Sequence, residues 1–418
     1  MRKIGTMAIA LFTIVYAEGQ EVLFESYVTV DGNYSFNNAS VIKVSEDEEF
    51  VNIAASLSFF IDESSAVCGQ KTSNQYVYLA FTSVGSIGSI QWADNSALTS
   101  GIRSFRLLPD INSGLTVMAS FPDINRSFTG DFHSQSDCYR IGIGNAVLFN
   151  DTNFEYRVDE YCNPVNSIDI FEEVENQYVG ITSNFNSSNV HVWDKETLNK
   201  VTVWQFPWTP SLAFIDVMNK QIYSVQNYSQ GSQYYSCNVQ SWNVSGQLET
   251  TTQLKSNITS YPSVIVSKSR NYYLYTKGSK EENSIIEVFS REGDLIGSDE
   301  VDGQINIIKS LSDDRLMVLV SHLNERGENV LELIFYTSEL NARSRLNLGM
   351  SNSIPSQMFV NQDESEAIIT GIVHTDIGPD ASKREKNKLM LVLIDLTDMD
   401  ESTQSGTTLI KQLEISKD

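Results

Sequence analysis

The stretch VHVWDKETLNKVTVWQF at residues 190–206 decides the fold, because it reads as two alternating strands joined by a short polar turn. Its first strand ends in a tryptophan, and its second strand resumes the alternation of apolar and polar residues. The same arrangement returns three times, as CNVQSWNVSGQLETTTQL at 237–254, SIIEVFSREGDLIGSDEV at 284–301 and VLELIFYTSELNARSRLNL at 330–348. A hairpin with an aromatic residue before its turn is therefore the repeating unit of this chain.

The spacing of the repeat predicts the architecture. If Trp193, Trp242, Phe289 and Tyr336 are equivalent, successive units are 49, 47 and 47 residues apart. A period near 47 residues with four strands per unit is typical of a β-propeller blade. The frame extends to three further positions, namely Trp92, Phe149 and Ile394. We therefore predict an all-β propeller of seven four-stranded blades over residues 50–418, with an eighth blade as the open alternative.

The stretch VHVWDKETLNKV resembles a WD40-type blade, and VQSWNVSGQL and IEVFSREGDL are similar to the looser blades of WD40-like and quinoprotein-like propellers. The chain has one Trp-Asp pair, Trp193 and Asp194, and it lacks the Gly-His dipeptide of WD40 repeats. The resemblance therefore implies the propeller architecture, and it assigns no functional residue of that family to this chain.

The N-terminus predicts entry into the secretory pathway. Residues 1–17, MRKIGTMAIALFTIVYA, combine two cations, a short apolar run and small residues before a cleavage site, as a signal peptide does. No later stretch is long and apolar enough to suggest a membrane span. We expect a protein of the secretory lumen or the extracellular space. Residues 18–49 form an N-terminal segment in which EVLFESYVTV could close the ring as a strand of the last blade, begin an eighth blade, or pack outside.

The charge balance excludes one class of partner. The chain has 29 Lys and Arg against 53 Asp and Glu, a net charge of −24, which argues against binding to nucleic acid through phosphate attraction. Acidic clusters at 46–49, 299–302 and 398–401 could associate weakly with Ca²⁺, but they lack the spacing of a dedicated site. We otherwise expect no cofactor and no bound metal.

Two kinds of covalent modification fit an oxidising compartment. The four cysteines allow two disulfides, for which we favour Cys138 with Cys162 and, by remainder, Cys68 with Cys237. Eight sequons precede residue 260, at Asn33, Asn38, Asn125, Asn150, Asn186, Asn227, Asn243 and Asn257. We expect Asn186, Asn227 and Asn257 to lie in connections between strands. A partner would then approach the glycan-free C-terminal portion most easily.

The sequence favours binding over catalysis. There are four histidines, at 133, 191, 322 and 374, and no G-x-S-x-G motif, so we assign no catalytic residue. Trp204, Phe206 and Trp208 could form an aromatic platform at the central opening for a sugar or peptide, but we favour packing between blades as the role of these residues. A basic loop at 383–388 could meet an anionic partner or remain solvated.

Our leading hypothesis is a secreted, glycosylated module that binds an extracellular protein or glycan, or serves a structural role, without chemistry of its own. One alternative is a propeller-type hydrolase or lyase that uses acidic residues, with or without Ca²⁺, in the central channel. The other is an acidic component of secretory granules or of the extracellular matrix.

Overall fold

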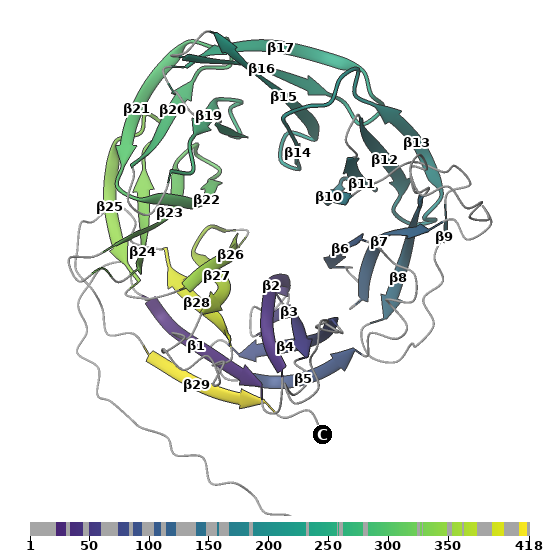
Figure 1. Ribbon diagram of the computed structural model, residues 1–418, viewed down its shortest axis with the longest axis vertical. Helices are drawn as coiled ribbons and strands as arrows, with labels where there is room; N and C mark the ends of the chain where they lie inside the picture. The colour runs from purple at the N-terminus through teal and green to yellow at the C-terminus, as the bar shows by residue number, and fades with distance from the viewer. Residues whose placement is uncertain are drawn as a thin grey trace, which may run out of the picture.

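The computed structural model describes residues 22–30, 34–44, 50–59, 74–82, 87–93, 104–109, 114–122, 139–147, 157–158, 167–183, 187–230, 234–256, 258, 262–278, 283–323, 327, 329–348, 353–361, 363–373, 387–396 and 409–415. All regular structure in these residues is β-strand. The strands form small twisted sheets arranged in a ring around a common centre (Figure 1). The prediction of an all-β propeller is therefore confirmed.

The strands build seven sheets, six of four strands and one of five. Within each four-stranded sheet, chain order runs from the strand nearest the centre of the ring to the outermost strand (Figure 1). We number these sheets as blades 1 to 6.

Blade 1 contains β2 (Tyr34–Val44), β3 (Phe50–Phe59), β4 (Asn74–Thr82) and β5 (Ile87–Ala93). Blade 2 contains β6 (Ser104–Pro109), β7 (Gly114–Pro122), β8 (Tyr139–Val147) and β9 (Arg157–Val158). Blade 3 contains β10 (Ser167–Val174), β11 (Gln177–Ser183), β12 (Ser188–Asp194) and β13 (Lys200–Gln205).

Blade 4 contains β14 (Leu212–Asp216), β15 (Gln221–Gln230), β16 (Tyr234–Trp242) and β17 (Leu248–Lys255). Blade 5 contains β18 (Ser263–Val266), β19 (Tyr272–Tyr275), β20 (Ser284–Phe289) and β21 (Leu295–Val301). Blade 6 contains β22 (Gln304–Ser310), β23 (Leu316–Leu323), β24 (Asn329–Tyr336) and β25 (Ala342–Asn347).

Blade 7 closes the ring and combines both ends of the chain. Its order is β26 (Ser353–Val360), β27 (Glu366–Val373), β28 (Lys388–Asp395), β1 (Val22–Val30) and β29 (Leu409–Ile415). β1 pairs antiparallel with β28 and parallel with β29, so the N-terminal strand lies between two C-terminal strands. The segment EVLFESYVTV therefore closes the ring as a strand of the last blade, which is one of the three roles considered for it.

Two details of the predicted blades are wrong. Blade 7 has five strands because β29 adds to the outer edge of β1, whereas four were expected in every blade. The boundary expected at residues 49 and 50 separates β2 from β3, which pair along most of their length within blade 1. The propeller therefore includes strands that begin well before residue 50.

Where side chains are described, the core lies between neighbouring sheets, because blades 3 to 6 each bury apolar side chains on both faces. In β24, Leu331, Leu333 and Phe335 pack in the cluster shared with blade 7, whereas Ile334 and Tyr336 pack in the cluster shared with blade 5. Similar clusters join blades 2 to 3, 3 to 4 and 4 to 5. A four-stranded sheet cannot bury two faces by itself, so the blades stabilise one another.

Candidate binding face

Two sets of tight turns lie at the same end of the ring, and we call this end the turn face. The outer turns, 194–199, 243–247, 290–294 and 337–341, join the third strand of a blade to the fourth. The inner turns, 175–176, 217–220, 267–271, 311–315 and 361–365, join the first strand to the second. Because neighbouring strands within a blade are antiparallel, both sets lie at the same end of every blade.

The outer turns explain the repeated motif of the sequence. Trp193, Trp242, Phe289 and Tyr336 each lie at or next to the end of a third strand, are at most 7% exposed, and mark a shift of register against the fourth strand. Their predicted equivalence is confirmed.

The three further positions of the repeat have different outcomes. Ile394 is a buried residue of β28, which is also a third strand. Trp92, however, lies on the fourth strand, β5, and the register shift of blade 1 falls between Ala80 and Phe81. Phe149 lies outside the described residues.

The residue after each aromatic holds its outer turn together. Its side-chain oxygen accepts hydrogen bonds from backbone N–H groups of the turn, which would otherwise need water. These bonds are Thr197 N to Asp194 Oδ1 at 2.8 Å, Gln247 N to Asn243 Oδ1 at 3.0 Å, Asp294 N to Ser290 Oγ at 3.3 Å and Asn341 N to Thr337 Oγ1 at 3.1 Å. The side-chain and backbone hydrogen bonds from Thr197 lower the pKa of Asp194.

The inner turns share an uncommon backbone conformation. One non-glycine residue in each has a positive φ, between 55° and 67°, in the left-handed region: Glu175, Lys220, Arg270, Asp314 and Glu364. L-residues adopt this region at an energetic cost, so the surrounding contacts must hold it.

Contacts between successive blades supply that support. Lys220 of blade 4 pairs with Glu175 of blade 3, and Asn219 Nδ2 donates to the Ser267 carbonyl of blade 5 at 3.0 Å. Blades 5 and 6 are joined by Ser269 N donating to Asp314 Oδ1 at 3.0 Å.

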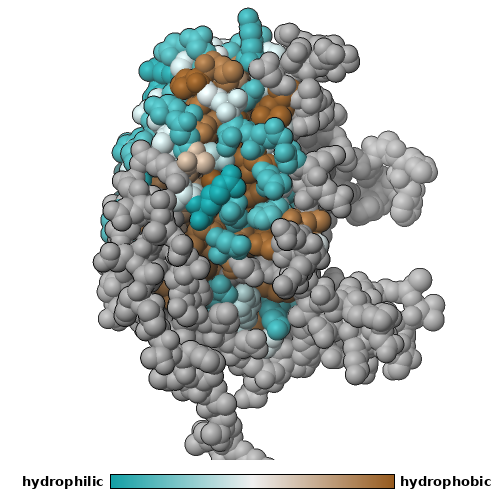
Figure 2. Space-filling model, turned by 90° about the vertical axis from the view of Figure 1, so that its left-hand side faces the viewer, coloured by the Kyte–Doolittle hydropathy of each residue, from teal (hydrophilic) through white to brown (hydrophobic). Residues whose placement is uncertain are grey.

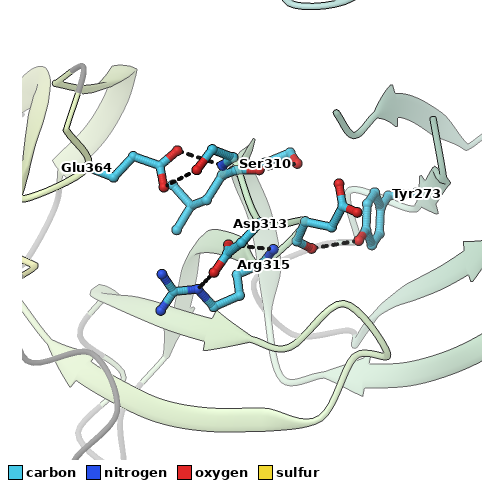
Figure 3. Close-up of polar contacts among 8 residues, drawn as sticks. Tyr273, Ser310, Asp313, Arg315 and Glu364 are labelled. Atoms are coloured by element: carbon cyan, nitrogen blue, oxygen red, sulfur yellow. Dashed lines mark hydrogen bonds and ion pairs between the residues drawn. The ribbon is translucent and has the colours of Figure 1, made fainter. Parts of the chain in front are cut away.

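Blade 6 extends the series in both directions. The Tyr273 hydroxyl of blade 5 donates to the Asp314 carbonyl at 2.8 Å, and Ser312 donates through its backbone N and Oγ to the Glu364 carboxylate of blade 7 at 2.6 and 2.9 Å. Figure 3 shows Glu364 and Tyr273 on opposite sides of the blade 6 turn, in which Arg315 pairs with Asp313. The inner turns of blades 3 to 7 therefore form one continuous hydrogen-bonded and ion-paired series.

The buried carboxylate of Asp216 begins the blade 4 inner turn. Asn219 donates to it twice, from its backbone N at 3.1 Å and from Nδ2 at 2.7 Å. Burial nevertheless raises the pKa of Asp216, and the two Asn219 bonds and the charge of Arg270 counteract this only in part. Because the charge of Arg270 lowers the pKa of Asp216, this cation of blade 5 lies near the carboxylate of blade 4.

The turn tips differ in what they present to solvent. The blade 5 tip has exposed Lys268 and Ser269, the blade 6 tip has exposed Ser312 and Asp313, and the blade 7 tip has exposed Asp363. The blade 4 tip instead carries Val217 and Met218, which are 45% and 49% exposed. Among the described inner turns, that of blade 4 is thus the one that exposes large apolar side chains at its tip.

The predicted aromatic platform is not at the centre of the ring. Trp204 belongs to β13, the outermost strand of blade 3, and its Nε1 donates to the Val244 carbonyl of the next blade at 3.1 Å. Phe206 is 1% exposed and packs edge to face with Trp204, at 4.9 Å between ring centroids. Trp208 packs on the same cluster. Placement at the central opening is therefore wrong, and these rings form packing between blades.

Cys237 is a free thiol in the structure, so the predicted pairing with Cys68 is not formed there. The side chain is fully buried among apolar residues, its Sγ donates to Asn227 Oδ1 at 3.0 Å, and burial raises the pKa of the thiol to about 12. Cys68, Cys138 and Cys162 lie outside the described residues.

Two sequons can be placed with their side chains. Asn243 begins the outer turn of blade 4. Asn227 lies within β15, opposite Cys237, so its predicted location in a connection is wrong. Asn38 lies in β2, and Asn33, Asn125, Asn150, Asn186 and Asn257 lie outside the described residues.

The structure places four of the remaining candidates, His191, Asp299, His322 and Lys388. His191 is fully buried, its Nε2 lies 3.0 Å from Thr182 Oγ1, and its ring stacks on Trp193. In the acidic cluster at 299–302, Asp299 accepts a hydrogen bond from the Tyr336 hydroxyl at 2.8 Å. His322 and Lys388 lie on β23 and β28. His133, His374, residues 383–386 and the clusters at 46–49 and 398–401 lie outside the described residues. Across the described ranges, no group of three metal-ligating side chains comes together.

The sequence analysis missed the inner turns. Their signal is a four-residue segment at the end of each first strand or directly after it: DVMN at 216–219, SKSR at 267–270, LSDD at 311–314 and NQDE at 361–364. Comparison of these segments with one another sets DVMN apart, because its two middle residues, Val217 and Met218, are both apolar.

No family model matches this chain, and no curated protein does. Solved structures do match it in shape. The Dos1 propeller has a TM-score of 0.47 at 9% identity and covers 94% of this chain and 97% of its own. Hsv2 of Kluyveromyces marxianus has a TM-score of 0.40 at 11% identity, covering 84% of this chain and 96% of that one. A Dyadobacter fermentans protein of unknown function has a TM-score of 0.45 at 9% identity, covering 91% and 100%.

The part of the chain that the structure describes contains no helix long and apolar enough to cross a membrane.

Proposed function

We propose that this protein is a secreted, glycosylated β-propeller that binds an extracellular protein or glycan through its turn face and performs no chemistry itself. The observation that carries the proposal is the series of joined inner turns. Hydrogen bonds and ion pairs fix the backbone of each turn against the next blade, so the side chains at the tips project from a rigid base. Rigid presentation reduces the entropy lost on binding, as a recognition surface requires.

Secretion and glycosylation rest on the sequence. The signal-peptide pattern of residues 1–17 ends before β1 begins at Val22, so cleavage after Ala17 would leave the ring-closing strand intact. Asn243 lies in a turn, where a glycan can extend from the surface without disturbing a sheet.

Expression of the full chain in a eukaryotic secretory host tests this part of the proposal. We expect the protein in the medium with Glu18 as its first residue, and a decrease in mass after enzymatic removal of N-linked glycans. The matched variant Ser245→Ala removes the sequon of Asn243 but keeps the side chain that holds the turn, and it should be secreted with one glycan fewer. Retention inside the cell with residues 1–17 still attached would contradict secretion.

A further inference from the structure

The blade 4 inner turn differs from its counterparts in a way that folding does not require. The tips of blades 5, 6 and 7 include Ser269, Asp313 and Asp363, whereas Val217 and Met218 occupy the corresponding tip of blade 4. All four turns have the same kind of positive-φ residue and the same kind of contact with a neighbouring blade. Polar tips are therefore sufficient for the turn, and the two apolar side chains of blade 4 need another explanation.

The charges around this tip have one predominant sign. Lys220 follows Met218 in the same turn, and Lys268 and Arg270 lie on the adjoining turn of blade 5, to which Asn219 is hydrogen-bonded. Glu175 pairs with Lys220, and Asp216 is buried beneath the turn. The exposed side chains of these two tips are thus two apolar residues, Val217 and Met218, together with Lys220, Lys268 and Ser269, and the partly buried cation Arg270 lies beside them. This sector is unusual on a chain of net charge −24.

We infer that the sector formed by Val217, Met218, Lys220, Lys268 and Arg270 binds a short acidic segment of a partner protein that carries an apolar anchor residue. The anchor would cover Val217 and Met218, and Asp or Glu residues beside it would meet the three cations. This inference rests on the proposed binding function and adds the chemistry of the partner to it.

The rest of the turn face argues against a membrane as the partner. A flat anionic bilayer would approach all the turn tips together, including Asp313 on blade 6 and Asp363 and Glu364 on blade 7. Those carboxylates would repel it. A peptide confined to blades 4 and 5 avoids them, so charge complementarity favours a small acidic segment.

The outer rim is a weaker candidate. Leu295 and Ile296 on β21 are each 46% exposed, but the side of the molecule that carries β21 and β25 shows hydrophobic patches separated by hydrophilic residues (Figure 2). Nothing on that side selects a partner chemistry.

A random 12-residue peptide library, displayed on phage and selected against the secreted full-length protein, tests the inference. We expect enriched peptides to combine Asp and Glu with one Leu, Phe, Ile or Trp. Fluorescently labelled copies should bind about tenfold more weakly to the double variant Val217→Ser with Met218→Ser, which copies the polar tips of the other blades. The double variant Lys268→Gln with Arg270→Gln should bind more weakly and with less dependence on salt.

Controls separate this inference from the broader proposal. Asp363→Ser changes the blade 7 tip and should leave binding unchanged, and equal urea midpoints would show that all variants are folded. Peptides that bind the Val217→Ser, Met218→Ser variant as tightly as the wild type would overturn this site while leaving a binding propeller. Absence of any enriched peptide would count against both. Phosphatidylserine vesicles that sediment the wild type but not the apolar-tip variant would replace the peptide with a membrane.

Discussion

At the scale of single residues, the turn face depends on positions where a side chain would be in the way. Gly293 has a φ of +94°, and a Cβ there would lie 2.6 Å from the Gln253 carbonyl and 3.0 Å from Thr252 Cγ2 of the preceding blade. The obstruction includes backbone, which cannot turn aside as a flexible side chain can. The glycine therefore serves two purposes, the left-handed turn and the close approach of blades 4 and 5.

We predict that Gly293→Ala destabilises the protein by about 2–4 kcal/mol, because both the φ penalty and the collision act against it. Equilibrium unfolding in urea measures the loss. Gly327→Ala is the matched control, since Gly327 also has a positive φ, +74°, but no atom lies within 4 Å of its added Cβ. That variant should lose about 1 kcal/mol. Equal losses in the two variants would mean that the contact between blades contributes nothing.

Glu25 on the ring-closing strand gives a prediction about pH. Burial raises the pKa of this carboxyl, although the Tyr27 hydroxyl donates to it at 3.0 Å. The folded protein therefore holds the proton more tightly than the unfolded chain does. The group favours folding at low pH, and this contribution is lost as the pH rises through the raised pKa.

Replacement Glu25→Gln removes this titration and keeps an acceptor for Tyr27. We expect the stability of the variant relative to the wild type to be greater at pH 8 than at pH 4.5, as measured by urea midpoints at both values. A relative stability that does not change with pH would contradict the assignment.

At the scale of turns and strands, the contacts between inner turns should differ in strength. Glu364 accepts two hydrogen bonds from Ser312 across the boundary between blades 6 and 7, whereas Lys220 and Glu175 form an ion pair whose side chains are 57% and 60% exposed. Solvent screening weakens the exposed pair. The contacts therefore secure successive blades unequally.

We predict that Glu364→Ala lowers the free energy of unfolding by about 1 kcal/mol, because it removes two hydrogen bonds to Ser312, whose donors lie at the surface and can turn to water instead. Lys220→Ala should lower it by less than about 0.5 kcal/mol. Thermal or urea unfolding of the two variants side by side measures the difference. A larger effect from Lys220→Ala would show that charge at the exposed pair dominates this boundary.

The sequence predicted well what repeats and poorly what occurs once. Trp193, Trp242, Phe289 and Tyr336 were recognisable because each ends a third strand of the same kind and precedes a polar cap. Trp92 was misplaced because an aromatic residue on a fourth strand has the same local pattern. Packing between blades was favoured for Trp204 and Phe206, but an exposed platform stayed open because sequence alone does not distinguish the two. The inner turns have no glycine at their positive-φ residues, so the usual signal for such a turn was missing.

At the scale of the whole molecule, blade 7 determines whether the ring is complete. β1 supplies the fourth strand of this blade, and β29 supplies only a fifth strand beyond it. The two ends of the chain should therefore matter to different degrees.

We predict that deletion of residues 18–30 from the secreted protein prevents closure, because β28 loses its neighbour and an apolar sheet edge becomes exposed. The product should aggregate or expand, which size-exclusion chromatography with light scattering detects. Deletion of residues 409–418 should leave a monomer with a lower melting temperature, because β1 remains paired with β28. A compact, stable monomer after the N-terminal deletion would refute this view of closure.

The position of β1 also determines when the ring can close during synthesis. β1 leaves the ribosome well before its partners β28 and β29, which are made more than 350 residues later, at 388–395 and 409–415. At usual elongation rates this interval lasts about 20–80 seconds. During that time the nascent chain can form blades but cannot close the ring. Its N-terminal strand must remain unpaired and must not add to the edge of another blade. Chaperones would therefore be expected to bind the N-terminal strand until its partner strands have been made.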